Sequence, residues 1–502
     1  MEPTTWTAQP VRVVETHISV LLFFGDRVYK LHKPVRFDFL DFTDREARAT
    51  DCHREVELNR RLAPDVYLGV ADLVMDGTPI DHMVVMRALP EDRQLAALLR
   101  SGEVAKAVLD QIAAVLASFH AAATRSAEIT ASASSAELAH RWQENFDEVG
   151  RLVDNPLDAG MESEIRLLVD LWLGSHQGLL EERMAQGFIC DGHGDLQASD
   201  IYCLEDGVRI LDCLEFSDLL RWGDVCADVA FLVMDLERLG HPEAARAFVD
   251  AYEHHSGHRL PPSLLHLHVA LRAYIRAKVG CLRSAKTDTA SEPVDLQALA
   301  LIHLRAARSA LVLIGGLPGT GKSTLAAALA RETGWRLLRS DEVRQARPAD
   351  DDRYAPASRA AVYEDLLEIG RADLAQGRSV ILDASWSSAQ ERDLAAQVAA
   401  ETGVELLTIC CRCDASVGAT RIKERLAQGA DPSEATVAVR DAMRARFDPW
   451  PSAVVVDTSR ASIDATLEAA FVGLASALPS AVGLDPSGPE GTKVPASRGF
   501  SL

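Results

Sequence analysis

A short stretch past the middle of the chain has residue types and a spacing that can bind phosphate. The P-loop pattern G-x-x-x-x-G-K-S occurs in the run Gly316-Leu317-Pro318-Gly319-Thr320-Gly321-Lys322-Ser323-Thr324. Glycines let backbone N–H groups surround a phosphate at the N-terminus of a helix, whose dipole also favours anions. Lys322 supplies a mobile charge for the β- and γ-phosphates, and Ser323 offers a hydroxyl to Mg²⁺. The run therefore predicts a site for ATP and Mg²⁺ rather than a glycine-rich turn without a ligand.

Carboxylates and arginines farther along the chain suit the same chemistry. Asp341 follows a short apolar run, where it could orient and deprotonate an acceptor hydroxyl, and Asp383 ends another such run, as a Mg²⁺ ligand would. Arg421 and Arg425 share one face of an expected helix. They open a lid candidate, residues 421–446, that would close over the γ-phosphate. The alternative for these two arginines is a solvated basic face.

The first half of the chain contains a second group of aspartates. His193-Gly194-Asp195 lies in an expected loop, and Asp200 occupies the Asn position of the pattern H-x-D-x-x-x-x-N. Phosphoryl transfer needs one carboxylate near the acceptor hydroxyl and further groups on Mg²⁺. Asp195 suits the first role, and Asp200 and Asp212 suit the second.

The elements that must hold these residues can be read from hydrophobic patterns. A buried strand is expected at 311–314 and a helix after Ser323, followed by alternating short strands and helices. This alternation predicts a doubly wound parallel sheet with ligands at the strand C-termini. In the first half, strands are expected over 11–31, 70–75 and 81–89, around a helix at 44–62, before a mainly helical region to about 282. We therefore expect an α+β kinase-like domain followed by an α/β domain.

The first half resembles the aminoglycoside phosphotransferase branch of the kinase-like fold, whose catalytic loop carries the His193-Gly194-Asp195 sequence. The resemblance implies that Lys30, in Val28-Tyr29-Lys30, is the ATP lysine, and that Glu55 is its ion-pair partner, with Glu57 as the second choice. Two features depart from the pattern: Gly25 stands alone where a glycine-rich loop would cover the phosphates, and Asp200 replaces Asn. The alternative is a degenerate kinase fold that does not use ATP.

The second half resembles small-molecule P-loop kinases of the gluconate- and shikimate-kinase-like group and, more distantly, the zeta-toxin kinases. The resemblance rests on the P-loop, on Ser340-Asp341-Glu342, on Leu382-Asp383-Ala384-Ser385 and on the two lid arginines. To about residue 475, the chain is similar to bacterial bifunctional aminoglycoside phosphotransferase/ATP-binding proteins. We expect the kinase-like domain at 1–284, a linker with a short helix at 285–308, the P-loop domain at 309–478 and a disordered tail at 479–502.

Composition excludes several classes of protein. A net charge of −22 argues against nucleic acid as a partner. No secretory signal and no membrane-spanning apolar run is visible, and an odd number of scattered cysteines suits the cytoplasm. Cys410 and Cys413 form a C-x-x-C pair without a second pair, so a buried strand is the better interpretation than a metal site. The isolated residues His120, His254 and His255 receive no role.

These expectations lead to a function. The sequence predicts an enzyme that transfers the γ-phosphoryl group of ATP to a small hydroxylated molecule, with no nucleic-acid or membrane partner. The alternative is a regulatory ATPase switch with a kinase-shaped sensor, which would release only inorganic phosphate. An antibiotic-modifying enzyme rests on fold analogy alone. The sequence names neither the acceptor nor the oligomeric state.

Overall fold

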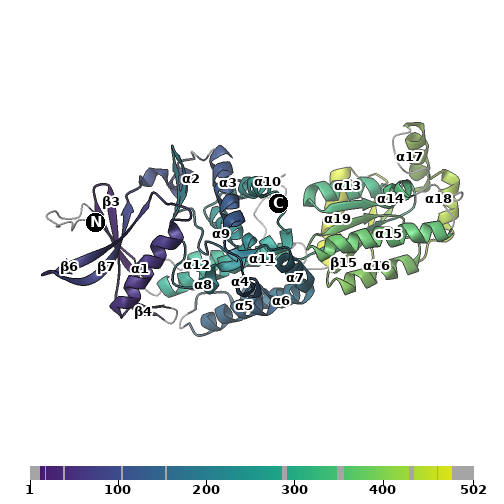
Figure 1. The fold of residues 1–502 in the computed structure, drawn as a ribbon. Coiled ribbons are helices and arrows are strands. Elements are labelled where there is room, and N and C mark those ends of the chain that lie inside the picture. Colours follow the sequence, from purple (N-terminus) through teal and green to yellow (C-terminus); the bar gives the residue numbers. More distant parts are fainter. Residues whose placement is uncertain are drawn as a thin grey trace. The chain divides into compact units, whose positions relative to one another are not determined.

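Two compact units, each built from two separate stretches of the chain, make up the computed structural model (Figure 1). Unit 1 comprises residues 1–141 and 183–260, and unit 2 comprises residues 142–182 and 261–502. The structure describes residues 12–477, except for residues 17, 38–39, 103, 105, 153–154, 285–290, 348–355, 429–434 and 461. The tail predicted at 479–502 lies outside the described residues.

Unit 1 begins with an antiparallel sheet in the order β1-β2-β3-β7-β6. Its strands, a small second ribbon and the helix that packs on the sheet are β1 (Arg12–Glu15), β2 (Ser19–Phe24), β3 (Arg27–His32), β4 (Arg36–Phe37), β5 (Leu40–Asp41), α1 (Arg45–Asn59), β6 (Tyr67–Met75) and β7 (Thr78–Arg87). The stretch 11–31, predicted to form strands, contains β1, β2 and most of β3. The chain turns between β1 and β2, where Thr16 and Ser19 are hydrogen-bonded to each other. In β3, Val28, Lys30 and His32 are buried, whereas the residues between them are partly exposed. This alternation turns Lys30 and His32 toward α1.

The mainly helical region predicted up to about residue 282 is confirmed, and a hairpin at residues 201–210 interrupts it. Its elements are η1 (Glu91–Arg93), α2 (Leu95–Ser101), α3 (Lys106–Ala122), α4 (Ala127–Ala131), α5 (Ser135–Gly150), α6 (Ala159–Ser175), α7 (Gln177–Ala185), β8 (Ile189–Asp191), β9 (Ile201–Leu204), β10 (Gly207–Ile210), α8 (Asp218–Arg221), β11 (Trp222–Asp224), α9 (Val225–Arg238), α10 (Pro242–Ser256) and α11 (Pro262–Ser284). A β-rich part followed by a helical part is the predicted kinase-like arrangement. Within the described ranges, no helix is long and apolar enough to cross a lipid bilayer.

The sheet of unit 2 is parallel throughout, with the strand order β13-β14-β12-β15-β16. Its elements are α12 (Ser291–Ala306), β12 (Ala310–Gly315), α13 (Lys322–Thr333), β13 (Arg336–Arg339), α14 (Ser340–Ala346), α15 (Pro356–Ala375), β14 (Val380–Asp383), α16 (Ala389–Glu401), β15 (Glu405–Arg412), α17 (Ala415–Gln428), α18 (Val437–Arg444), β16 (Val454–Asp457) and α19 (Ile463–Ala477). Helix α12 begins inside the predicted linker. The predicted doubly wound sheet is confirmed.

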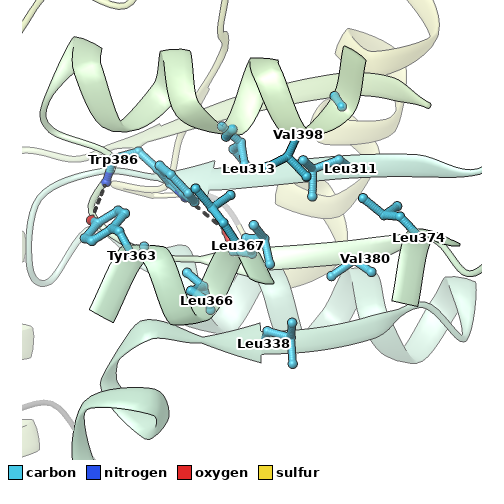
Figure 2. Packing of buried hydrophobic residues seen from close by; sticks show 14 of the residues in the cluster. Leu311, Leu313, Leu338, Tyr363, Leu366, Leu367, Leu374, Val380, Trp386 and Val398 are labelled. Carbon is cyan, nitrogen blue, oxygen red and sulfur yellow. Dashed lines mark hydrogen bonds between the residues drawn. The ribbon is translucent and has the colours of Figure 1, made fainter. Parts of the chain in front are cut away.

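Helices cover both faces of this sheet. The central strand β12 is buried on both sides, and its successive side chains point to opposite faces. Leu311 and Leu313 pack with residues of α15 and α16 (Figure 2). Val312 and Ile314 pack with residues of α13 and α19. With helices on both faces, the carboxyl ends of the strands are left as the edge where a ligand can bind.

The end of α6 and the residue that follows it pack near the starts of β12 and β15, at the edge of the sheet opposite the carboxyl ends of its strands. His176, between α6 and α7, stacks on Trp172 with ring centroids 4.4 Å apart, and its Nε2 lies 3.3 Å from the Ser309 hydroxyl next to β12. Gly403, after α16, leaves no room for a side chain, because an added Cβ would lie 2.6 Å from the Cβ of Ser175. The P-loop sheet and these helices therefore form one packed body.

We predict that His176 makes unit 2 acid-sensitive. Burial lowers the pKa of His176 from 6.5 to about 4, so the unfolded chain binds this proton more readily than the folded chain. Stability should therefore be full above pH 6.5 and fall as the pH drops toward 4. At about 1.4 kcal/mol per pKa unit, the loss is roughly 3 kcal/mol. Urea unfolding at several pH values should show a weaker pH dependence for His176→Gln, whereas His254→Gln, at an exposed position, should behave like the wild type. Equal pH dependence in all three proteins would refute the prediction.

Candidate functional site

The P-loop of unit 2 joins the end of β12 to the start of α13, and close approach of neighbouring backbone requires its glycines. Gly316 has φ 138° and Gly319 has φ 79°. A Cβ on Gly316 would lie 2.5 Å from the carbonyl oxygen of Cys411, and one on Gly319 would lie 2.5 Å from that of Gly418. Any other residue at these two positions would be strained and would also collide with backbone.

Every carbonyl of the loop from residue 317 to residue 321 accepts a hydrogen bond. Leu317 O accepts from the N–H and the hydroxyl of Thr320, at 3.2 and 2.8 Å. Gly321 O accepts from Leu325 N at 3.0 Å, within the first turn of α13. The three carbonyls between them accept from side chains of distant segments: Arg440 Nη1 on Pro318 O at 2.7 Å, Cys413 Sγ on Gly319 O at 3.6 Å, and Thr458 Oγ1 on Thr320 O at 2.7 Å.

The N–H groups of the loop show the opposite pattern. Within the described residues, the N–H groups of Gly319, Gly321, Lys322 and Ser323 donate no hydrogen bond. Carbonyls held from outside and free N–H groups at the start of a helix form a cradle for an anion. Gly316 N is engaged differently, since it donates to Ser385 O at 3.1 Å.

Asp383, at the end of β14, is a buried acidic residue beside the P-loop, where Lys322 and Ser323 act on its carboxylate. Its Oδ2 accepts from Arg339 Nε at 3.3 Å, while its Oδ1 is buried without a hydrogen-bond partner. Burial raises the pKa of Asp383, although Lys322, the Ser323 hydroxyl and Arg339 oppose the increase. A buried, unpartnered carboxylate oxygen beside a serine hydroxyl fits Mg²⁺, which takes oxygen ligands and binds through one or two carboxylates plus phosphates.

Asp341 and the two predicted lid arginines also lie at this edge of the sheet. Asp341 is in the first turn of α14, near enough to Asp383 to raise the pKa of that residue, and its own Oδ1 accepts from Arg344 at 2.5 Å. Arg421 donates to the hydroxyl and the carbonyl of Thr458, at 3.1 and 2.7 Å. Arg425 donates to Ala435 O at 2.9 Å. Their predicted roles in catalysis stay predictions.

Unit 1 contains a separate group of charged residues around Lys30. The Lys30 ammonium lies 2.9 Å from Glu55 Oε1 and 3.3 Å from Asp212 Oδ1, whereas Glu57 contacts Arg54 instead. Burial would lower the pKa of Lys30, but Glu55, Asp212 and Glu215 together raise it well above its usual value. The structure thus pairs Lys30 with the first of the two glutamates considered from the sequence, and holds the lysine fully charged.

The loop at His193 is fixed by Asp228 on α9. The Asp228 carboxylate accepts from His193 N at 2.7 Å and from Gly194 N at 2.9 Å, and it lies 3.1 Å from His120 Nε2. Burial would raise the pKa of Asp228, but these contacts lower it well below its usual value. His120, which received no role from the sequence, therefore helps to hold the loop at His193 through Asp228.

The aspartates of this loop lie close together. Burial, together with Asp212 and Asp195, raises the pKa of Asp200 well above its usual value. Asp212 has φ 62°, a left-handed conformation that is rare outside glycine. In the part of the chain that the structure describes, no group of three or more His, Cys, Asp or Glu residues is arranged to hold a metal by itself. A cation bound to these aspartates would therefore take further ligands from water or from a bound molecule.

Sequence reasoning missed several residues that shape the two sites. Arg440, Thr458 and Ser385 hold the P-loop, and Asp228 and Glu215 serve the site around Lys30. A signal existed for Thr458, which follows β16 at the carboxyl edge of the sheet, where ligands bind. Cys410 is buried in the core, and Cys413 contacts the P-loop. His255 contacts Asp110, on a different helix of unit 1.

Comparisons with known proteins add the following. Residues 311–450 match the family described as AAA domain, AAA_33. The Mycobacterium tuberculosis protein Rv2004c is 37% identical over 463 residues, which cover 89% of this chain and 92% of the relative. The Mycobacterium bovis protein Mb2027c has the same identity and coverage.

Solved structures with a similar course of the chain include two kinases. A choline/ethanolamine kinase family protein from Mesorhizobium loti is 15% identical, with a TM-score of 0.39, and the match covers 60% of this chain and 93% of that chain. A gluconokinase from Sinorhizobium meliloti is 20% identical, with a TM-score of 0.25, and the match covers 34% and 92%. Likenesses this low carry no argument about function.

The two glutamates on α1 give a prediction that separates a buried ion pair from an exposed one. Glu55→Gln should destabilise the protein by about 3 kcal/mol, because it removes one partner of a buried pair. Glu57→Gln should cost less than about 1 kcal/mol, because its pair with Arg54 is exposed to solvent. Thermal unfolding of the full chain should show a Tm roughly 5–10 °C lower for the first variant only. Equal shifts in the two variants would contradict this assignment of the pair.

Proposed function

The chain belongs to the family of the mycobacterial proteins Rv2004c and Mb2027c, and we propose that its P-loop is the ATP site of a small-molecule kinase. The observation that carries the proposal is the orientation of the loop. Its five carbonyls from 317 to 321 all accept hydrogen bonds, three of them from distant segments, while the N–H groups of Gly319, Gly321, Lys322 and Ser323 donate none within the described residues. A phosphate chain is the ligand that such a cradle fits best.

The proposed reaction is the transfer of the γ-phosphoryl group of ATP to a hydroxyl group. The acceptor oxygen forms a bond to the γ-phosphorus while the bond to the β–γ bridging oxygen breaks, and ADP leaves. Asp341 orients the hydroxyl and takes its proton. Lys322 and the free N–H groups hold the β- and γ-phosphates, and Arg421 and Arg425 supply positive charge to the transition state when the lid candidate closes.

Mg²⁺ fits the residues at this edge of the sheet. Ser323 and Asp383 would hold it, because Asp383 has a buried oxygen without a hydrogen-bond partner. When bound, Mg²⁺ would neutralise charge on the β- and γ-phosphates. We propose no nucleic-acid or membrane partner, and the cytoplasm as the location, where the cysteines remain reduced.

Unit 1 supports a second candidate function, a further ATP-dependent phosphotransferase site of the aminoglycoside phosphotransferase type. The observation in its favour is the contact of the buried Lys30 with the buried Glu55 and with the partly exposed Asp212. In this proposal Lys30 binds the nucleotide phosphates, Asp195 faces the acceptor hydroxyl, and Asp200 and Asp212 hold Mg²⁺. The chain would then be a bifunctional protein, with the predicted division into domains at 1–284 and 309–478. The alternative is that unit 1 is a sensor that transfers no phosphate and that the P-loop only hydrolyses ATP. The whole chain would then be a regulatory ATPase switch.

The nucleotide site is tested first with Lys322→Ala in the full chain. Among the described residues, none forms a hydrogen bond or ion pair with the Lys322 side chain that its loss would break. The variant should therefore stay folded and lose at least about tenfold in affinity for Mg-ATP at the P-loop. Calorimetry reports the number of sites as well as the affinity, so a second site in unit 1 would be seen separately. Lys106→Ala, at an exposed position on α3 and outside both proposed sites, is the matched control. Unchanged binding in Lys322→Ala would refute the P-loop assignment.

The two carboxylates at the sheet edge are tested against each other. Asp341→Asn should lower phosphoryl transfer by roughly 10² to 10⁴ while nucleotide binding is retained, because it removes the proton acceptor. Asp383→Asn should mainly raise the Mg²⁺ concentration needed for activity, since a lost metal contact is partly recovered by mass action. Transfer rates are measured over a range of Mg²⁺ concentrations, with an acceptor found by screening sugars, polyols and aminoglycosides. Equal losses that do not respond to Mg²⁺ would mean that the two roles are misassigned.

A further inference from the structure

Arg440 is an arginine of α18 that is buried rather than exposed. Its side chain is 4% exposed, and it is the one buried residue of this helix. Its Nη1 donates to Pro318 O at 2.7 Å, and both of its terminal nitrogens lie 3.8 Å from Cys413 Sγ. A charged side chain therefore attaches α18 to the P-loop.

The space around Arg440 is filled by backbone. Gly418 lies on α17, and a Cβ there would lie 1.8 Å from Arg440 Nη1. The carbonyl of Gly418 in turn lies 2.5 Å from where a Cβ of Gly319 would be. The P-loop, α17 and the guanidinium group are thus in direct contact, and the guanidinium group has little freedom to move away from Pro318 O.

The contact with Pro318 O determines where the next N–H points. The carbonyl of residue 318 and the N–H of residue 319 belong to one planar peptide unit, and in a trans peptide they point in opposite directions. All peptide bonds of the described residues are trans. Pro318 has no N–H of its own, so its carbonyl is the group through which this corner of the loop can be held.

From this geometry we propose that Arg440 is a positioning residue for the nucleotide. By holding Pro318 O outward, it turns the N–H of Gly319 into the cradle, where that N–H meets the phosphates. Arg440 itself contacts no phosphate in this scheme. The inference rests on the proposed function, because it assigns Arg440 to the ATP site of the P-loop.

Three variants of the full chain test the proposal. Arg440→Met keeps the length and the burial of the side chain but removes its donors. Arg440→Lys keeps one donor and the charge. Gly418→Ala leaves Arg440 unchanged and adds a methyl group where the guanidinium group lies, although Gly→Ala within a helix is normally stabilising. The matched controls are Arg331→Met, at an exposed position in the last turn of α13 and outside the lid candidate, and Gly174→Ala, at a helical glycine with nothing within 4 Å of its added Cβ.

The measurement is the affinity for ATP and for AMP of the site that Lys322→Ala abolishes, with Tm as a check on folding. We expect Arg440→Met and Gly418→Ala to weaken ATP binding about tenfold or more and AMP binding much less, because a misdirected N–H affects the β- and γ-phosphates. Arg440→Lys should recover part of the loss, and both controls should behave like the wild type.

The outcomes separate this inference from the proposed function. If Arg440→Met is folded and binds ATP within about twofold of the wild type, Arg440 does not position the loop. If Arg440→Met fails to fold, the ATP affinities of Arg440→Lys and Gly418→Ala are judged by the same criterion. Binding within about twofold of the wild type in both variants would overturn the inference. An equal loss of ATP and AMP affinity would show a merely structural role and overturn the inference. If the wild type has no Lys322-dependent ATP binding at all, the proposed function fails, and this inference fails with it.

Discussion

The carbonyl and the N–H of a peptide unit point in opposite directions, and the architecture of unit 2 follows from this constraint. A loop that turns its N–H groups toward a phosphate must turn its carbonyls toward the protein, where buried carbonyls need donors. The chain supplies these donors from three distant segments: Cys413 after β15, Arg440 on α18 and Thr458 after β16. The parallel sheet matters to function because it brings the ends of its strands, and the segments that follow them, to one edge.

Charge is distributed differently in the two units. In unit 2, the buried Asp383 has one oxygen near Arg339 and one oxygen without a partner, beside Lys322 and Ser323. In the proposed function, this oxygen and the Ser323 hydroxyl hold the cation, and Lys322 meets the phosphate chain. In unit 1, Lys30 already has two carboxylate partners at hydrogen-bond distance, Glu55 and Asp212. The lysine of unit 1 is therefore held in place by the protein, whereas Lys322 forms no ion pair at hydrogen-bond distance within the described residues.

Local patterns in the sequence were sufficient for some features and not for others. The P-loop, the strand that ends at Asp383 and the alternation of strands and helices depend on neighbouring residues, and the structure shows them where the sequence predicts them. Residues such as Arg440 and Asp228 act through partners more than 30 positions away, so no local pattern predicts them. Thr458 differs, because its place directly after β16, at the carboxyl edge of the sheet, is a sequence signal. The short helix predicted within 285–308 is present as α12. It begins within the polar stretch and packs against α6 and α11 in the folded unit.

The central claim is that the P-loop of unit 2 transfers phosphate to a small hydroxylated molecule. The most direct test is to follow the label from γ-labelled ATP after incubation with the full chain, with and without a pool of sugars, polyols and aminoglycosides. The account predicts a labelled small molecule that forms only when the pool is present and that disappears in Lys322→Ala. Labelled inorganic phosphate as the only product, formed at the same rate with and without the pool, would contradict the account and identify a regulatory ATPase instead.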